Sequence, residues 1–325
     1  MSHSQGWTYR VVGLVGIGAA ALGCGGVTAA SPDAGNDAPA EAGPPLTTAD
    51  GCTNVATALC NSLDACAPVA VQVLYGDKST CVSRAVLSCT TDQSVEGIAR
   101  TANDLASCAA ALSGATCDDL LAGTFPSVCT AKPGTVVNGM ACGSDLQCAS
   151  TFCNKTDACG VCSPRQAAGG DCAVDGGCVS GLVCASKKCV APAGPGGDCN
   201  LPNQPCRSDL YCPTMNGSAK CAAKLGAGGA CTDSDQACDL AKGVICNPLT
   251  HVCDPIKVAK GGEACSLASK TLCVGFVAPC SSFLTGGVCA NPAQDGETCG
   301  GNAVCVPPAT CQNKICRLPS APDCR

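Results

Sequence analysis

The sequence predicts a small disulfide-rich fold, in which an N-terminal disulfide-stapled α-helical module precedes six loop-rich, short-β, four-cysteine repeats. The chain has 35 cysteines among 325 residues, but only one Trp, three Tyr and four Phe. Such a cysteine share exceeds the roughly 8–10% that marks a disulfide scaffold, and these scaffolds need an oxidising compartment. Helical periodicity also ends near Pro133, and a repeat of about 30 residues follows it.

The first residues are typical of an export signal. Arg10 precedes an apolar run from Val11 to Leu22, which has the length of a signal-peptide core and is too short to span a bilayer. We therefore expect residues 1–23 to be a signal peptide.

The end of this signal, Ala21-Leu22-Gly23-Cys24, is similar to the lipobox of bacterial lipoproteins, in which the cysteine is lipidated and becomes the first mature residue. It departs from the usual pattern because Ala21 stands where leucine is preferred. The alternative is ordinary signal cleavage after Ala30, where Thr28 and Ala30 are the small residues that such a site needs. Either route removes Cys24 from the thiols and leaves 34 cysteines, an even number.

Residues 24–48 are expected to be the lipidated cysteine and a disordered tether. The stretch from Gly25 to Thr48 is rich in Ala, Pro, Gly and Asp and has no apolar periodicity. A coil of this length reaches roughly 25–30 Å. We expect the lipid on Cys24 to be the membrane contact, at the outer membrane or cell surface.

Residues 49–133 are expected to form the helical module, with eight cysteines. A first helix follows Asp50 as its cap, and a second follows Gly76-Asp77. A third is expected from about Ser94 to Leu112. A short fourth begins at the capping box formed by Thr116 to Asp119.

Two of these helices carry cysteines eight residues apart, Cys52 with Cys60 and Cys81 with Cys89. Each pair is about 12 Å apart along its helix, beyond the roughly 4.4–6.8 Å that a disulfide spans between Cα atoms. If the two helices form an antiparallel hairpin, the simplest pairing joins Cys52 to Cys89 and Cys60 to Cys81. Four more cysteines would tie on the other helices: Cys66, Cys108, Cys117 and Cys129.

Residues 134–325 are expected to be the repeat array. Each unit begins with a glycine three residues before its first cysteine, and these glycines are Gly139, Gly169, Gly196, Gly228, Gly262 and Gly296. We expect each glycine to supply a positive-φ turn. Units of this size lie below the roughly 40 residues that fold on a core alone, so two disulfides per unit, each contributing about 2–4 kcal/mol, replace the core.

The structural cysteines of the array are expected in sets of four. The sets are Cys142, Cys148, Cys153 and Cys159; Cys172, Cys178, Cys184 and Cys189; Cys199, Cys206, Cys212 and Cys221; Cys231, Cys238, Cys246 and Cys253; Cys265, Cys273, Cys280 and Cys289; Cys299, Cys305, Cys311 and Cys316. Cys162 and Cys324 do not fit, because they would be far apart in an extended array. Either the pairing frame shifts at the ends, or the chain folds back, or two thiols stay free; we favour a local shift in unit one.

No catalytic residue, cofactor or metal site is predicted. Cys159-Gly-Val-Cys162 is a C-x-x-C motif, but it lies in a Gly/Pro-rich stretch, which favours a structural role. Zinc sites usually repeat such pairs, and a Ser or Cys nucleophile needs a partnered base. His251 is the sole histidine after the signal region, and we expect it on the surface of a loop.

Two further patterns favour ordinary loops. Asp233, Asp235 and Asp239 match no complete calcium loop and are expected to be solvated. Asn154 and Asn216 begin glycosylation acceptor patterns, but a bacterial export route favours ordinary turn residues.

The layout resembles a large group of uncharacterised bacterial cysteine-rich lipoproteins, whose repeats are labelled Dickkopf-like. The resemblance rests on the lipobox, the tether, the helical segment around Tyr75-Gly76, and the motifs Asn138-Gly-Met-Ala-Cys142 and Gln147-Cys-Ala-Ser150 before the repeats. It covers nearly the whole chain and implies an architecture rather than an activity, because the label reflects cysteine spacing.

The expected function is that of a non-enzymatic, surface-displayed structural stalk or protein-interaction module, with an extracellular or cell-surface protein as partner. The alternative is a protease-inhibitor-like or ligand-binding secreted protein, since exposed loops on rigid staples suit that work. A net charge of −6 and few aromatic residues disfavour a nucleic-acid partner.

Overall fold

The computed structural model describes residues 45–324 except 122, 156–158, 174, 201–202, 214–218, 232–236, 248, 267–268, 275–279, 283–285, 302 and 319–323. The predicted signal peptide, Cys24 and nearly all of the predicted tether lie outside these residues. The helices of the N-terminal module are α2 (Thr48–Cys66), α3 (Pro68–Tyr75), α4 (Lys78–Gln93), α5 (Ala102–Leu112) and α6 (Cys117–Leu121). No helix in the described part is both long and apolar enough to cross a membrane.

Helix α2 begins earlier than expected, because Thr47 rather than Asp50 is its N-cap. The Thr47 hydroxyl accepts a hydrogen bond from the Asp50 amide at 3.1 Å, and the Asp50 carboxylate accepts one from the Thr47 amide at 3.0 Å. This reciprocal pair is a capping box, in which Asp50 is the third helical residue. The helix therefore starts inside the segment expected to be tether.

The expected start of the third helix at Ser94 is wrong. Helix α5 begins at Ala102, where Thr101 and Asp104 form a second capping box, with the Thr101 amide 2.8 Å from the Asp104 carboxylate. Helix α3 was not predicted; Pro68 opens it, and Gly76, at a φ of 87°, ends it. Thr116 caps α6 as expected, because its hydroxyl accepts a hydrogen bond from the Asp119 amide at 3.1 Å and donates one to the Asp119 carboxylate at 2.7 Å.

The disulfide pairing proposed for the helical hairpin is confirmed. Cys52 bonds to Cys89 and Cys60 to Cys81, with Cα–Cα distances of 5.6 and 6.0 Å. The remaining bonds of the module join Cys66 to Cys117 and Cys108 to Cys129. Besides these staples, the core holds the buried leucines Leu59, Leu105, Leu112 and Leu120.

The array consists of short strands and single 3-10 turns. Its strands are β1 (Ala141–Cys142), β2 (Cys153–Lys155), β3 (Gly160–Cys162), β4 (Val183–Ala185), β5 (Lys188–Val190), β6 (Asp198–Cys199), β7 (Leu210–Tyr211), β8 (Ala219–Lys220), β9 (Ala222–Ala223), β10 (Val244–Asn247), β11 (Val252–Pro255), β12 (Lys257–Ala259), β13 (Ala264–Cys265), β14 (Thr271–Cys273), β15 (Gly287–Val288), β16 (Asn291–Ala293), β17 (Ala303–Cys305), β18 (Thr310–Gln312) and β19 (Ile315–Arg317). The 3-10 turns are η1 (Ser127–Cys129), η2 (Asp145–Gln147), η3 (Asp175–Gly177) and η4 (Leu240–Lys242), of which η1 precedes the array. The strands form sheets of two or three strands, which agrees with a small disulfide-rich class.

The same local geometry recurs at all six glycines that open the units. Their φ angles lie between 69° and 90°, so the predicted positive-φ turn is confirmed. Each glycine amide donates to the carbonyl of a later cysteine at 2.8–2.9 Å, and the acceptors are Cys162, Cys189, Cys221, Cys253, Cys289 and Cys316. Each of these cysteines in turn donates its amide to the residue after the glycine. The turn and the last cysteine of a unit are therefore tied by a pair of backbone hydrogen bonds.

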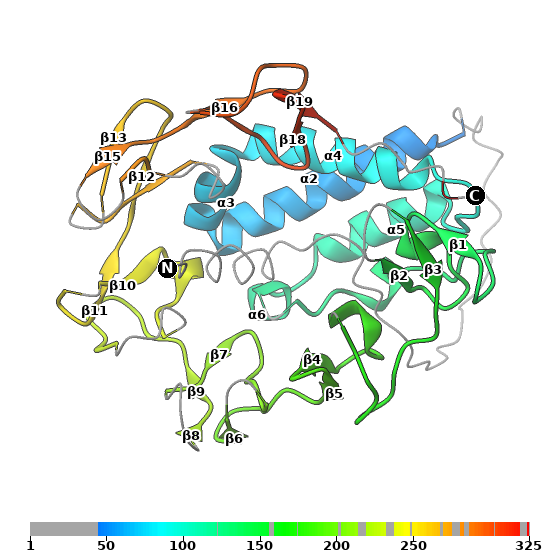
Figure 1. The fold of residues 1–325 in the computed structure, drawn as a ribbon, viewed down its shortest axis with the longest axis horizontal. Helices are drawn as coiled ribbons and strands as arrows, with labels where there is room; N and C mark the ends of the chain where they lie inside the picture. Colours follow the sequence, from blue (N-terminus) through cyan, green and yellow to red (C-terminus); the bar gives the residue numbers. More distant parts are fainter. Residues whose placement is uncertain are drawn as a thin grey trace, which may run out of the picture.

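The array curves around the helical module instead of extending away from it (Figure 1). Strands β1–β3 lie near α5, β4–β9 form the far side of the curve, and β16–β19 return beside α4. A disulfide between Cys159 and Cys324 joins the beginning of the array to its end. The chain from 159 to 324 is thus a covalent ring, with the helical module inside the curve.

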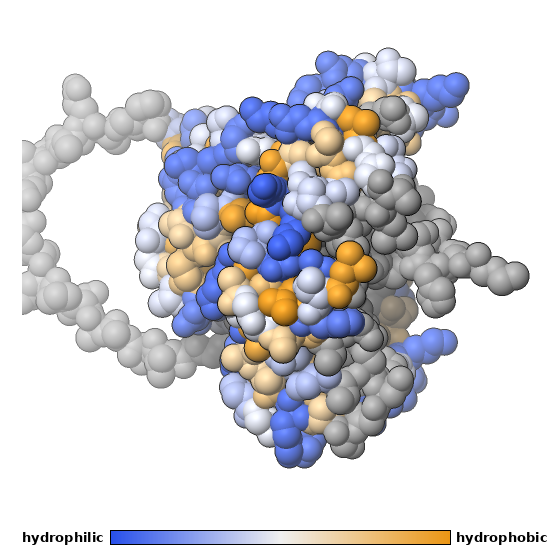
Figure 2. All heavy atoms as spheres, turned by 90° about the vertical axis from the view of Figure 1, so that its left-hand side faces the viewer, coloured by the Kyte–Doolittle hydropathy of each residue, from blue (hydrophilic) through white to orange (hydrophobic). Residues whose placement is uncertain are grey.

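The array contacts the helical module closely at several points. Near unit one, the Thr135 amide donates to the Gly97 carbonyl at 2.9 Å. In unit four, Gly243 packs so tightly on Val69 of α3 that a Cβ there would lie 2.7 Å from a Val69 methyl group. On the side that carries β10–β15, Figure 2 shows small hydrophobic groups separated by hydrophilic residues.

Candidate functional site

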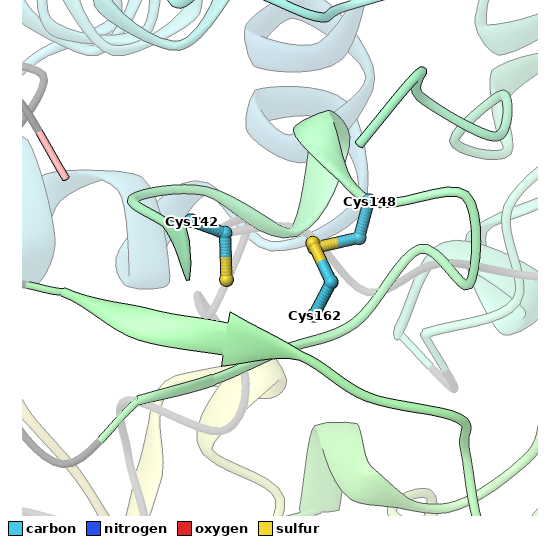
Figure 3. A group of neighbouring side chains, drawn as sticks. All are labelled: Cys142, Cys148 and Cys162. Atoms are coloured by element: carbon cyan, nitrogen blue, oxygen red, sulfur yellow. A yellow bond between two sulfur atoms is a disulfide. The ribbon is translucent and has the colours of Figure 1, made fainter. Parts of the chain in front are cut away.

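Groups of three cysteines are the densest clusters of chemically active side chains in the described residues. In unit one, the Sγ atoms of Cys142, Cys148 and Cys162 all lie within 4.8 Å of one another (Figure 3). Similar groups are formed by Cys172, Cys178 and Cys189; Cys199, Cys206 and Cys212; Cys231, Cys238 and Cys253; and Cys265, Cys273 and Cys289. Sulfur ligands at this spacing are what a soft metal ion prefers.

Each sulfur of these groups is, however, already part of a disulfide. In unit one, Cys148 pairs with Cys162, as Figure 3 shows, and Cys142 pairs with Cys153. A metal binds a thiolate, and a disulfide sulfur is not one. The clusters are therefore pairs of packed disulfides that replace a hydrophobic core.

Every unit uses the same connectivity, from first to third and from second to fourth cysteine. The other ten bonds are Cys172–Cys184, Cys178–Cys189, Cys199–Cys212, Cys206–Cys221, Cys231–Cys246, Cys238–Cys253, Cys265–Cys280, Cys273–Cys289, Cys299–Cys311 and Cys305–Cys316. Cysteine spacing alone does not define such a connectivity, so this wiring could not be predicted.

The set of four cysteines expected for unit one is wrong, because its last cysteine is Cys162 and not Cys159. In the β2–β3 pair, Cys153 lies opposite Cys162, and the Cys162 carbonyl accepts the Gly139 amide. Cys159 precedes β3 and bonds to Cys324 instead. The local shift that we favoured is thus combined with a chain that folds back, and the alternative of two free thiols is wrong.

The C-x-x-C motif is consequently split between two bonds. Cys162 is buried within unit one, whereas Cys159 is exposed and Cys324 is half-buried. The motif does not form an internal disulfide, in agreement with a structural role.

Arg84 on α4 is the main polar contact between the helices and unit six. Its side chain is buried, at 5% exposure, and its two terminal nitrogens each lie 2.8 Å from a carboxylate oxygen of Asp295. It also donates to the carbonyls of Pro307, at 2.7 Å, and Val306. Sequence reasoning missed this residue, although its place three residues after buried Cys81 put a charge on the inner face of the helix.

Asp92 of α4 lies within electrostatic range of Asp145 and Lys155 of unit one, and Asp145 in turn interacts with Arg165. Burial raises the pKa of Asp92 and of Asp145, while the Cys153 amide, 2.7 Å from Asp145, opposes the second shift. Arg165 lies over the Phe152 ring and donates to carbonyls of both units. Because Arg165 donates to one carbonyl in each unit, it forms a structural joint between the two units.

The remaining predicted loop residues are structural. His251 is exposed, at a φ of 53° in the turn between β10 and β11, as expected. Asp239 caps η4 and pairs with Lys242 at 3.0 Å, whereas Asp233, Asp235 and Asn216 lie outside the described residues. Asn154 was expected in a turn but lies in strand β2 opposite Val161.

The described residues thus present a disulfide framework and one exposed ring-closing bond. They also contain the arginine clamp, by which we mean buried Arg84 bound to Asp295 and to the carbonyls of Val306 and Pro307. Comparison of the chain with family models, with curated proteins and with solved structures found no match.

Proposed function

We propose that this protein is an exported lipoprotein, anchored through Cys24 at the outer membrane or cell surface, that serves as a rigid protein-interaction module without catalysis. The array is best understood as six equivalent four-cysteine units. The observation that carries this proposal is the closed, disulfide-fixed ring around the helices. The support is physical: a ring holds its exposed loops in fixed relative positions, which lowers the ordering cost of binding.

The ring argues for an interaction module over a stalk. A stalk separates its two ends, but the Cα atoms of Cys159 and Cys324 are 5.5 Å apart. The polar segment before α2 remains the candidate spacer, and the ring is the part that it would display.

The curve formed by units two and three is the best candidate for the contact surface. It lies on the far side from α2 and α4 (Figure 1). The hairpin of β4 and β5 turns at Ser186 and Lys187, with φ angles of 49° and 65°, and Cys184–Cys172 and Cys189–Cys178 hold its two strands. Its tip is therefore both exposed and rigid.

One observation favours a protease-inhibitor-like function as a second candidate. Leu249 is 76% exposed in the loop between β10 and β11, and its amide is held by the Asn247 side chain at 2.9 Å. The strands on either side are each held by a disulfide. An apolar side chain projecting from a stapled loop is the form in which an inhibitor meets a protease pocket.

The test is a pull-down from an envelope and extracellular fraction with the intact full chain and with the reduced and alkylated chain. An interaction module predicts a partner that is retained by the intact chain and lost from the alkylated one. Equal capture by both forms contradicts the proposal. For the inhibitor candidate, a panel of secreted proteases is assayed with the native protein and with Leu249→Asp, and inhibition unaffected by the substitution removes that candidate.

The anchoring part is tested separately by intact mass of the exported protein. A diacylated Cys24 and a gain of 34 protons on reduction are expected from the 34 cysteines that follow it. An N-terminus beginning after Ala30 supports plain secretion instead.

A further inference from the structure

Two disulfides differ from all others in having no buried cysteine. They are Cys159–Cys324 and Cys66–Cys117, each with one exposed and one half-buried partner. Every other bond has at least one cysteine in the buried core. A thiolate must reach a disulfide sulfur to attack it. Outside these two bonds, Cys311 is the one exposed cysteine among the described residues, and its partner Cys299 is buried, where its departure as a thiolate is disfavoured by desolvation. The two bonds without a buried cysteine are therefore the ones that exchange most readily in the folded protein.

The two bonds differ in the secondary structure around them. Cys66 ends α2, Cys117 begins α6, and Cys66 packs against the core around Leu59. Cys159 and Cys324 both lie outside helices and strands. After cleavage, the helices keep Cys66 and Cys117 close together, so that this bond recloses readily. Cys159 and Cys324 are not held by a helix or strand of their own.

Chain length adds to this difference. The cysteines of the ring-closing bond are 165 residues apart, and those of Cys66–Cys117 are 51 apart. In a flexible chain the probability that two ends meet falls with the 3/2 power of the separation, so without the fold the longer loop would close about sixfold less often.

We propose that Cys159–Cys324 is a thiol-exchange site, which an external dithiol opens ahead of every other disulfide of the chain. A thiolate of the dithiol attacks the sulfur of exposed Cys159, the S–S bond breaks, and Cys324 leaves as a thiolate that takes up a proton. The second thiol of the reagent then displaces Cys159 and forms the cyclic disulfide of the reagent. Two electrons and two protons pass to the protein.

Opening this bond converts the ring into an arc without releasing unit six. Arg84 still holds Asp295 and the carbonyls beside Pro307 from within α4. The disulfide pairs inside each unit also stay intact, so the opened protein keeps its fold. This inference stands independently of the proposed binding function, since it concerns only the accessibility of one bond.

The experiment is timed reduction of the purified full chain with limiting dithiothreitol at neutral pH, quenched with iodoacetamide and mapped by peptide mass spectrometry. Cys159 and Cys324 should be alkylated at least about tenfold faster than any other pair, because buried bonds react only through local opening. Equal rates, or earlier alkylation of Cys66 and Cys117 or of any unit, overturn the proposal.

Two matched variants show which disulfide gives the fast phase of reduction and alkylation. The double variant Cys159→Ser with Cys324→Ser should lose it and keep the slow phases, whereas Cys66→Ser with Cys117→Ser should retain it. Persistence of the fast phase in the first variant contradicts the proposal. Should either variant fail to fold, the alkylation map of the unmodified chain decides on its own.

Discussion

The guanidinium of Arg84 and the carboxylate of Asp295 form a two-point ion pair across 211 residues of sequence, with both N–O distances at 2.8 Å. The arginine side chain is 5% exposed and the aspartate 31%. Bidentate pairs of this kind are strong and directional. The pair therefore fixes where the array ends on the helical module.

Replacing Arg84 by Met should destabilise the protein strongly. The change leaves the Asp295 carboxylate and two backbone carbonyls without their donor. Because water reaches Asp295, the loss should lie at the low end of the about 3–5 kcal/mol that breaking a buried pair costs. Chemical denaturation of the non-reduced protein measures the effect. The control is Arg207→Met, since Arg207 forms a two-point pair with Asp209 that is exposed to solvent, and its loss should leave the denaturation midpoint almost unchanged. Similar losses in both variants would show that the clamp adds nothing beyond surface pairing.

The glycine that opens unit four should not tolerate alanine. Gly228 has a φ of 82°, and the space that a Cβ would occupy there is open, so the cost of Gly228→Ala is backbone strain alone, about 1–2 kcal/mol. Gly226 lies in the same turn, also next to open space, but without a positive φ. Gly226→Ala should therefore be neutral or stabilising by up to about 1 kcal/mol. Thermal unfolding of the two variants, side by side, checks this contrast, and a reversed order contradicts it.

Removing the Cys60–Cys81 bond by a double change to alanine should destabilise the helical module by about 3 kcal/mol. The bond closes a separation of 21 residues, and both cysteines are fully buried between α2 and α4. Helical circular dichroism during denaturation reports this module, because the array has only short strands. An unchanged midpoint would mean that packing around the bond, and not the cross-link, holds the hairpin.

Acid should weaken the start of α5. The ion pair with Lys132, together with the hydrogen bonds from Thr101, lowers the pKa of Asp104 from 3.8 to about 2. A lowered folded-state pKa stabilises the protein above the ordinary value, and this contribution is lost as the pH falls from about 4 toward 2. Because the pair is partly solvent-screened, the effect should be a fraction of the ideal linkage value. Asp104→Asn should flatten the stability profile in this window relative to Asp118→Asn, which changes an exposed aspartate of α6.

The sequence predicted those parts of the structure that depend on local spacing. Cysteines at positions 52, 60, 81 and 89 define one hairpin pairing, because helical rise leaves no other simple solution. The six glycines were recognised by their position three residues before a cysteine, and this recurrence predicted the positive φ that selects glycine. The start of α5 was missed because Ile98 continues the apolar stripe, while the capping box at Thr101 was overlooked.

The parts that depend on long-range packing could not be predicted. Arg84 and Asp295 have no common motif, and only the path of the array brings them together. Cys162 and Cys159 are three residues apart, and strand register alone decides which belongs to unit one. The ring could not be derived from the sequence either, because the even number of cysteines shows only that two of them remain after the units are paired.

The disulfide between Cys159 and Cys324 has a consequence for proteolysis. A protease that cuts one peptide bond anywhere between these two residues separates no fragment, because both new ends remain joined through the sulfur bridge. Loops on the outside of the array can therefore be nicked singly while the molecule keeps its full mass. The covalent integrity of the ring is therefore independent of the survival of any single loop between Cys159 and Cys324.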